Sequence, residues 1–264
     1  MTPLQADNKD HLKQLIEFHI RSYGTRVDLN HIDVSKVTDM ESLFEQSKFN
    51  GDISQWNVSN VETMMMMFSD SSFNGNISQW NTANVEDMTM MFSHSAFQGD
   101  LSTWNVSKVR SMRGMFEHTE GDKKLEAWDI SNVVSLRAIF LRSSGAIEVS
   151  SWNTSNVEDM EFIFMNSSFK GDISRWDLSS MVKHQYAFSE FHPSILGYLG
   201  VLKNTYPLPK NYPKIQKFEE LCALGDMLSL DLHQKAHMIY QEMHHPTAHL
   251  DDAFLDHSEW TAHL

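Results

Sequence analysis

The stretch that decides the fold reads Ile53-Ser-Gln-Trp-Asn-Val-Ser-Asn-Val-Glu-Thr-Met-Met-Met-Met-Phe68 and closes through Phe73 and Gly75. Residues of the same kind return 24 positions before and after it, which is the signature of a repeat architecture. Two of the recurring columns are aromatic: Trp56, Trp80, Trp104, Trp128, Trp152 and Trp176, and Phe44, Phe68, Phe92, Phe116, Phe140, Phe164 and Phe188.

Each unit combines two periodicities. The spacing Ile53-x-x-Trp56-x-Val58 is that of a leucine-rich repeat and predicts a short strand near Trp56 to Val58. The following Val61, Met64, Met67 and Phe68 fall on one face of a helix of about two to three turns. Ser59 and Glu62 fit a capping box at the start of that helix.

A single unit cannot bury its own apolar face, whereas stacked units share one core. We therefore predict an α/β repeat fold, a leucine-rich-repeat-like solenoid of about seven 24-residue strand–helix units over residues 29–190. Residues 1–28 form an N-terminal cap with an amphipathic helix over 10–21. Residues 191–264 abandon the period and form a mainly helical C-terminal cap or accessory segment.

A polar column follows each tryptophan. We interpret it as a structural ladder that satisfies backbone groups at a turn, with a ligand-binding ladder as the alternative. Its members are Asn57, Asn81, Asn105, Asp129, Asn153 and Asp177.

Composition excludes several classes of function. A net charge of −14 argues against a general nucleic-acid or anionic-membrane binder, since both partners need positive surface. Neither a secretory signal nor a run of 18 apolar residues is present, which predicts a cytoplasmic protein without membrane insertion, or a cell-surface protein if a leader was removed. Cys222 stands alone, so no intramolecular disulfide is expected.

Enzyme motifs are absent from the sequence, and we expect no catalytic residues, no cofactor and no metal site. The histidines crowd into the C-terminal part, where His233 and His237 stand four apart on a predicted helix. Metal-dependent activity in this His-rich segment is therefore a distant alternative.

Function is expected where the repeat lapses. Units three and four replace the Phe-x-Gly turn with Gly121-Asp-Lys-Lys124 and Gly145-Ala-Ile-Glu148. A cluster of basic residues accompanies the lapse, and it is either a patch for an acidic or phosphate-bearing partner or a charge-balanced surface paired with Glu117, Glu120 and Asp122. The cluster contains Lys108, Arg110, Arg113, Lys123, Lys124, Arg137 and Arg142.

A second anomaly is an apolar column on the side of the predicted helix that faces away from the core. Met66, Met90 and Phe162 share this column. Exposed apolar residues in a row mark interaction surfaces, although lateral packing between coils explains them equally well. With Lys108, Arg110, Arg113, Arg137 and Arg142, they complete the candidate partner-binding residues.

The motif Phe-Asn-Gly-Asp-Ile-Ser-x-Trp-Asn-Val-Ser-Asn-Val-x-x-Met-x-x-Met-Phe resembles the BspA-type bacterial surface-protein repeat, most clearly at residues 49–68, 73–92, 97–116 and 169–176. The resemblance spans roughly residues 10–190 and implies a leucine-rich-repeat-like fold with protein-binding or adhesive roles. We expect a non-catalytic, monomeric protein-binding module, such as an adaptor, inhibitor or immunity-type protein. The alternative is a surface adhesin or lipoprotein-type domain without its leader.

Overall fold

The computed structural model describes residues 4–171, 173, 175–177, 179–183 and 187. The chain divides into two compact units, Met1–Tyr206 and Pro207–Leu264. All described residues belong to the first unit. The segment 191–264, with His233 and His237, lies outside them. The elements are β1 (Leu4–Gln5), α1 (Lys9–Tyr23), β2 (Ile32–Asp33), β3 (Lys123–Lys124) and β4 (Ile147–Glu148).

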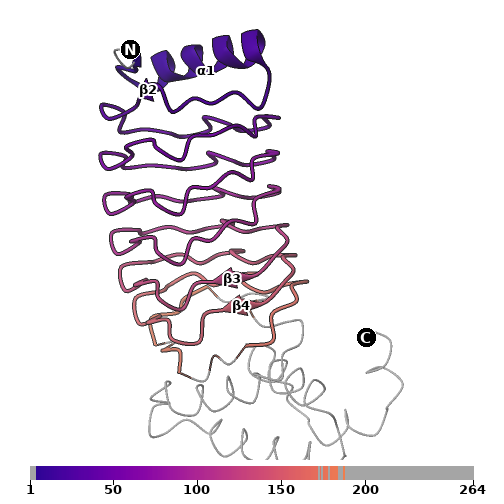
Figure 1. Ribbon diagram of the computed structural model, residues 1–264. Helices are drawn as coiled ribbons and strands as arrows, with labels where there is room; N and C mark the ends of the chain where they lie inside the picture. Colours follow the sequence, from indigo (N-terminus) through magenta and orange to yellow (C-terminus); the bar gives the residue numbers. More distant parts are fainter. Residues whose placement is uncertain (1–3, 172, 174, 178, 184–186, 188–264) are drawn as a thin grey trace, which may run out of the picture. The chain divides into compact units, whose positions relative to one another are not determined.

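Helix α1 lies where the sequence predicts the N-terminal helix, and it is slightly longer than residues 10–21. The side chain of Asn8 caps its first turn by accepting the backbone N–H of His11 at 3.0 Å. Gly24 ends it with a φ of +89°, which glycine adopts without steric penalty. Leu12 and Ile16 are buried in the same core as the first coil, over which α1 lies in Figure 1.

The repeats form a stack of coils (Figure 1). Parallel β-bridges join residues that are 24 positions apart in the sequence, so each coil lies in register on the next. Two short parallel pairs, β1 with β2 and β3 with β4, follow the same direction. One column of bridges runs through the described coils, linking Asp39, Thr63, Asp87, Ser111, Ser135, Asp159 and Lys183.

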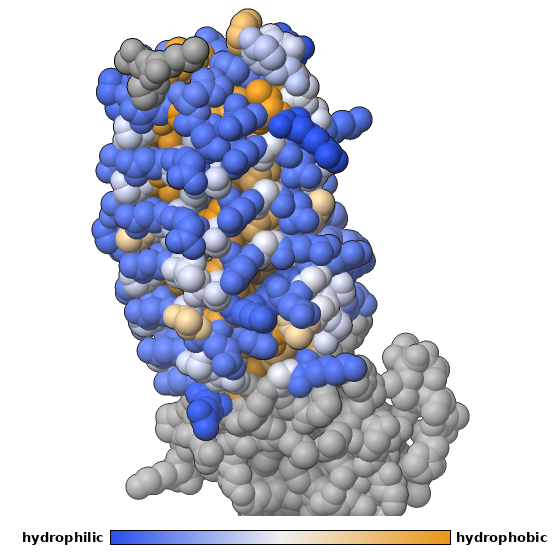
Figure 2. All heavy atoms as spheres, viewed as in Figure 1, coloured by the Kyte–Doolittle hydropathy of each residue, from blue (hydrophilic) through white to orange (hydrophobic). Residues whose placement is uncertain are grey.

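The tryptophan column holds the stack together from inside. Each indole is buried, and its Nε1–H donates to the backbone carbonyl 27 residues earlier, as Trp128 does to Leu101 at 2.9 Å. The rings of Trp56 and Trp80 stack with centroids 6.3 Å apart. On the face seen in Figure 2, hydrophilic residues dominate the surface and hydrophobic ones appear only between them.

The helices predicted within the repeats are wrong. Val61, Met64, Met67 and Phe68 are all buried, as predicted, but the described residues contain turns there and no helix. The backbone N–H of Met64 and that of Phe68 donate to the next coil instead of along the segment, and Met67 N–H closes a turn onto Met64 at 3.1 Å. Because no helix begins there, Ser59 and Glu62 do not form the predicted capping box.

Coil spacing explains this correction. Bridged coils lie about 4.8 Å apart, whereas an α-helix with its side chains is about 10 Å wide. Turns are flat enough to stack at the strand spacing. They depend on left-handed residues in two columns, one containing Met66 and Met90 at φ 55° and 54°, the other His94 and His118 at 55° and 54°. Alternate amides then point along the stack and bond to the neighbouring coil.

The strand predicted near Trp56 to Val58 is also absent from the described residues. Residues 56–58 are irregular, and a turn lies on each side of them. The polar column beside tryptophan is structural: Asn57 Oδ1 accepts the N–H of Ser59, and its counterparts in the other units make the same bond. A neighbouring column links the coils, since the Asn60 amide donates to the Ser35 carbonyl. Asn84, Asn132 and Asn156 repeat that bond.

Candidate functional site

Units three and four differ from the others by an exchange of volumes. In a regular unit the phenylalanine ring folds over the glycine two residues later, so a Cβ at Gly99 would lie 2.5 Å from the Phe97 ring. Where Gly121 replaces that phenylalanine, Lys123 replaces the glycine and is buried. Gly145 and Ile147 make the same exchange one coil later. In both units a large side chain two residues later replaces the missing phenylalanine, so the core stays filled at this level.

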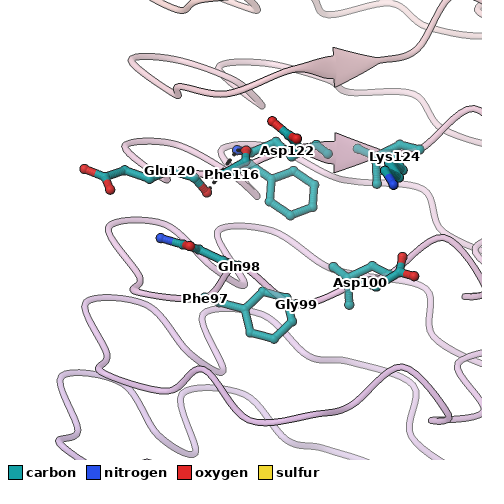
Figure 3. A pocket seen from close by; sticks show the side chains of 12 residues that line it. Phe97, Gln98, Gly99, Asp100, Phe116, Glu120, Asp122 and Lys124 are labelled. Carbon is teal, nitrogen blue, oxygen red and sulfur yellow. Dashed lines mark hydrogen bonds between the residues drawn. The ribbon is translucent and has the colours of Figure 1, made fainter.

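Lys123 fills only part of the space left by the missing ring. A cavity of about 480 Å³ remains beside it (Figure 3), with the rings of Phe97 and Phe116 on neighbouring coils among its walls. Burial lowers the pKa of Lys123 to about 8. Its ammonium donates to three backbone carbonyls, those of Glu120, Gly121 and Ser144, at 3.4, 2.7 and 3.1 Å. These bonds use all three donors, so we assign Lys123 to the fold and not to ligand binding.

A second hollow forms in the left-handed column that begins with Ser42 and Met66. Gly114 and Ala138 follow Met90 in this column, and Phe162 comes next. The two small residues leave a depression of about 420 Å³ between the larger side chains of Met90 and Phe162. This depression, which we call the arginine hollow, is also lined by Arg113, Glu117, Arg137, Leu141, Arg142, Met165 and Asn166.

The arginine hollow gathers three cations from neighbouring coils. Arg137 forms an ion pair with Glu161 and lies over the Phe162 ring, with its guanidinium carbon 5.2 Å from the ring centroid. Arg142 donates to Nε2 of His118 at 3.1 Å. Arg113 is exposed, and no carboxylate in the described part of the chain lies within salt-bridge distance of it. Two of the three guanidiniums therefore have no carboxylate partner among the described residues.

Five of the eight predicted partner-binding residues meet at this hollow: Met90, Arg113, Arg137, Arg142 and Phe162. The other three do not line it. Lys108 replaces an asparagine of the coil-linking column and donates to Asn84 Oδ1 at 2.7 Å, a structural role. Arg110 is exposed, and its backbone N–H bonds to the Glu86 carbonyl. Met66 is half-buried one coil before Met90.

The carboxylate partner of the basic cluster is not one that the sequence suggested. Arg137 pairs with Glu161, which stands 24 positions later and therefore in the same column of the next coil. It does not pair with Glu117, Glu120 or Asp122. Glu117 instead lines the hollow and lies beside His94.

Sequence reasoning missed a group of possible metal ligands. His94, Glu117 and His118 each place one donor atom within 4.8 Å of the others, and no other such group of three or more occurs among the described residues. The 24-residue separation of His94 and His118 was the available signal, because it places both in one column on adjacent coils.

The part of the chain that carries the repeat matches a known protein family. The sequence profile of a family described as "Mycoplasma protein of unknown function, DUF285" matches residues 14–124 and 96–194. The chain belongs to this family. No curated protein and no solved structure matches the chain. The DUF285 region covers the stacked coils and both hollows. In the described residues, no helix has the length and apolar character needed to cross a bilayer.

Proposed function

We propose that this DUF285 chain is a non-catalytic protein-binding module and that the arginine hollow receives an acidic segment of its partner. The observation that carries the proposal is the convergence of Arg113, Arg137 and Arg142 around one depression in a chain of net charge −14. A local positive site on an acidic molecule selects for carboxylate-bearing ligands and repels basic ones.

The shape of the hollow adds to its charge. Gly114 and Ala138 have the smallest side chains of its lining, which leaves room for a side chain from a partner between Met90 and Phe162. Met90 and Phe162 flank it and supply apolar contacts, while guanidinium groups offer planar, paired donors that match a carboxylate. We propose that a segment combining acidic residues with one apolar residue fits this arrangement best.

The stacked coils supply the rigidity that such a site needs. We infer that they act as a solenoid in the leucine-rich-repeat sense, built from turns in place of helices. The BspA-type relationship, the monomeric state and the cytoplasmic location stay predictions, as does the alternative of a surface adhesin.

The test is a peptide-binding measurement on the full chain. A fluorescent peptide of glutamate residues around one leucine is titrated with the protein, and fluorescence anisotropy gives Kd. We expect Arg113→Gln with Arg142→Gln to weaken binding by about tenfold or more, since each charge-assisted hydrogen bond contributes about 1.5–3 kcal/mol. Added salt should weaken the wild-type complex.

The matched control removes the same charge elsewhere. Arg110→Gln with Lys48→Gln changes two exposed cations that do not line the hollow. This variant should bind the peptide like the wild type. Equal weakening in both double variants would mean that net charge, and not the hollow, controls binding.

A further inference from the structure

We propose that His94, Glu117 and His118 form a binding site for a divalent transition-metal ion such as Zn²⁺. The site adjoins the arginine hollow, because Glu117 lines the hollow and Arg142 donates to Nε2 of His118. It rests on the geometry of three side chains from two adjacent coils.

The histidine pair results from the stacking of coils. His94 and His118 occupy the same column, and both have left-handed backbones, with φ of 55° and 54°. Histidine tolerates this region better than most residues do. Their rings stack with centroids 4.2 Å apart and planes 15° apart. The fold therefore holds two imidazoles together without any contribution from the metal.

Glu117 supplies the third donor. Its Oε1 lies 4.0 Å from Nε2 of His94, and its side chain is 22% exposed. All three donor atoms lie within 4.8 Å of one another. Bonds of about 2.0–2.2 Å to a tetrahedral metal place donor atoms roughly 3.4 Å apart. Closing the site therefore takes about 1 Å of side-chain movement, with the two rings tilting toward each other.

The contact with Arg142 shows which ring nitrogen of His118 accepts a hydrogen bond. Arginine can only donate, so the 3.1 Å contact from Arg142 identifies Nε2 of His118 as an acceptor without a proton, which is the kind of nitrogen that a metal ion needs.

The donor set identifies the class of ion. Two imidazole nitrogens and one carboxylate oxygen favour Zn²⁺, Co²⁺ or Ni²⁺, whereas Ca²⁺ and Mg²⁺ prefer all-oxygen sites. Three protein ligands leave the fourth position for water or for a ligand from a partner. Arg142 opposes the ion, because its positive charge occupies the lone pair that the metal requires.

The experiment is a Co²⁺ titration of the full chain, followed by the strong visible absorption of the four-coordinate ion, with Zn²⁺ competition for affinity. We expect one equivalent of four-coordinate Co²⁺ in the wild type. That equivalent should disappear in His94→Asn and in His118→Asn. Asparagine stands in the same left-handed column at Asn166, so these variants should fold. Glu117→Gln, which preserves side-chain shape, should weaken binding by at least about 10–100-fold.

Two further variants sharpen the test. Arg142→Gln removes the competing cation and should tighten Co²⁺ binding. His11→Gln changes a half-buried histidine on α1, away from the three proposed ligands, and should leave the titration unchanged. Histidines outside the described residues contribute equally to every variant, so only the difference matters. The proposal is overturned if no four-coordinate Co²⁺ forms, if the His94 and His118 variants retain it, or if Arg142→Gln fails to tighten it.

Discussion

Restoring the regular repeat in unit three should stabilise the protein. The double variant Gly121→Phe with Lys123→Gly recreates the Phe-x-Gly turn in which Phe49 and Phe73 are fully buried. Burying a phenylalanine contributes about 1.5–3 kcal/mol, and stacking on a neighbouring ring adds about 0.5–1.5 kcal/mol. Glycine is lost at one position and gained at another, so backbone entropy changes little once residue 121 leaves its φ of +83° for the backbone of a regular unit.

The loss of Lys123 is nearly neutral on the same scale. Lowering its pKa from 10.5 to about 8 corresponds to roughly 3 kcal/mol of burial penalty for the ammonium. Its three charge-assisted hydrogen bonds to carbonyls offset that penalty. The net gain is therefore about 2–4 kcal/mol, which is about 5–15 °C in Tm for a unit of this size.

The two single variants make the test decisive. Gly121→Phe alone places a ring where the Lys123 side chain lies, at a residue whose φ is +83°. Lys123→Gly alone leaves the cavity larger and the Phe116 ring uncovered. Both should be destabilised, and urea unfolding followed by tryptophan fluorescence should give a coupling energy of at least about 2 kcal/mol. Additive effects within about 0.5 kcal/mol would show that the two side chains do not share one space.

Other changes test the backbone, the buried charge and the tryptophan ladder. Ala138→Gly relieves a left-handed φ of 56° and should stabilise by up to about 1 kcal/mol in urea unfolding, while Gly114→Ala should destabilise by a similar amount. Between pH 8 and 10.5 the unfolded chain holds a proton that folded Lys123 has lost, so stability should rise with pH across this window relative to Lys123→Met. A flat difference between the two pH profiles would contradict the buried charge. Trp128→Phe removes the bond to the Leu101 carbonyl and should destabilise by about 1–3 kcal/mol in thermal melts, whereas an unchanged Tm would show that the ladder is dispensable.

The sequence predicted burial well and backbone geometry poorly. Met64, Met67 and Phe68 are buried as their spacing indicates, because tandem turns and a helix can place the same residues inward. The sequence does not reveal left-handed residues when they are methionine, histidine or phenylalanine. Coils that keep the strand spacing on every side have no room for a helix in each unit, whereas a leucine-rich-repeat horseshoe gains that room by curving.

The candidate site was predicted in part for a similar reason. Arg113 and Arg137 were both predicted as partner-binding residues; they stand 24 positions apart in the sequence, and both line the hollow. The hollow exists because Gly114 and Ala138 are small. The sequence does not show this, since it does not reveal that these two residues share a surface column with Met90 and Phe162. Lys108 was predicted as a binding residue, but it replaces an asparagine in the column that links the coils and donates to Asn84 there.

The left-handed columns have an evolutionary consequence. The column from Gln46 through Asp70, His94, His118 and Arg142 contains a different chemical group on almost every coil, yet φ stays between 54° and 55°. The backbone contacts of one coil with the next do not depend on these side chains. Each coil therefore offers an outward position that mutation can rewrite without disturbing the stack. Duplicating a 24-residue segment adds another such position, so binding specificity and molecular length can evolve independently.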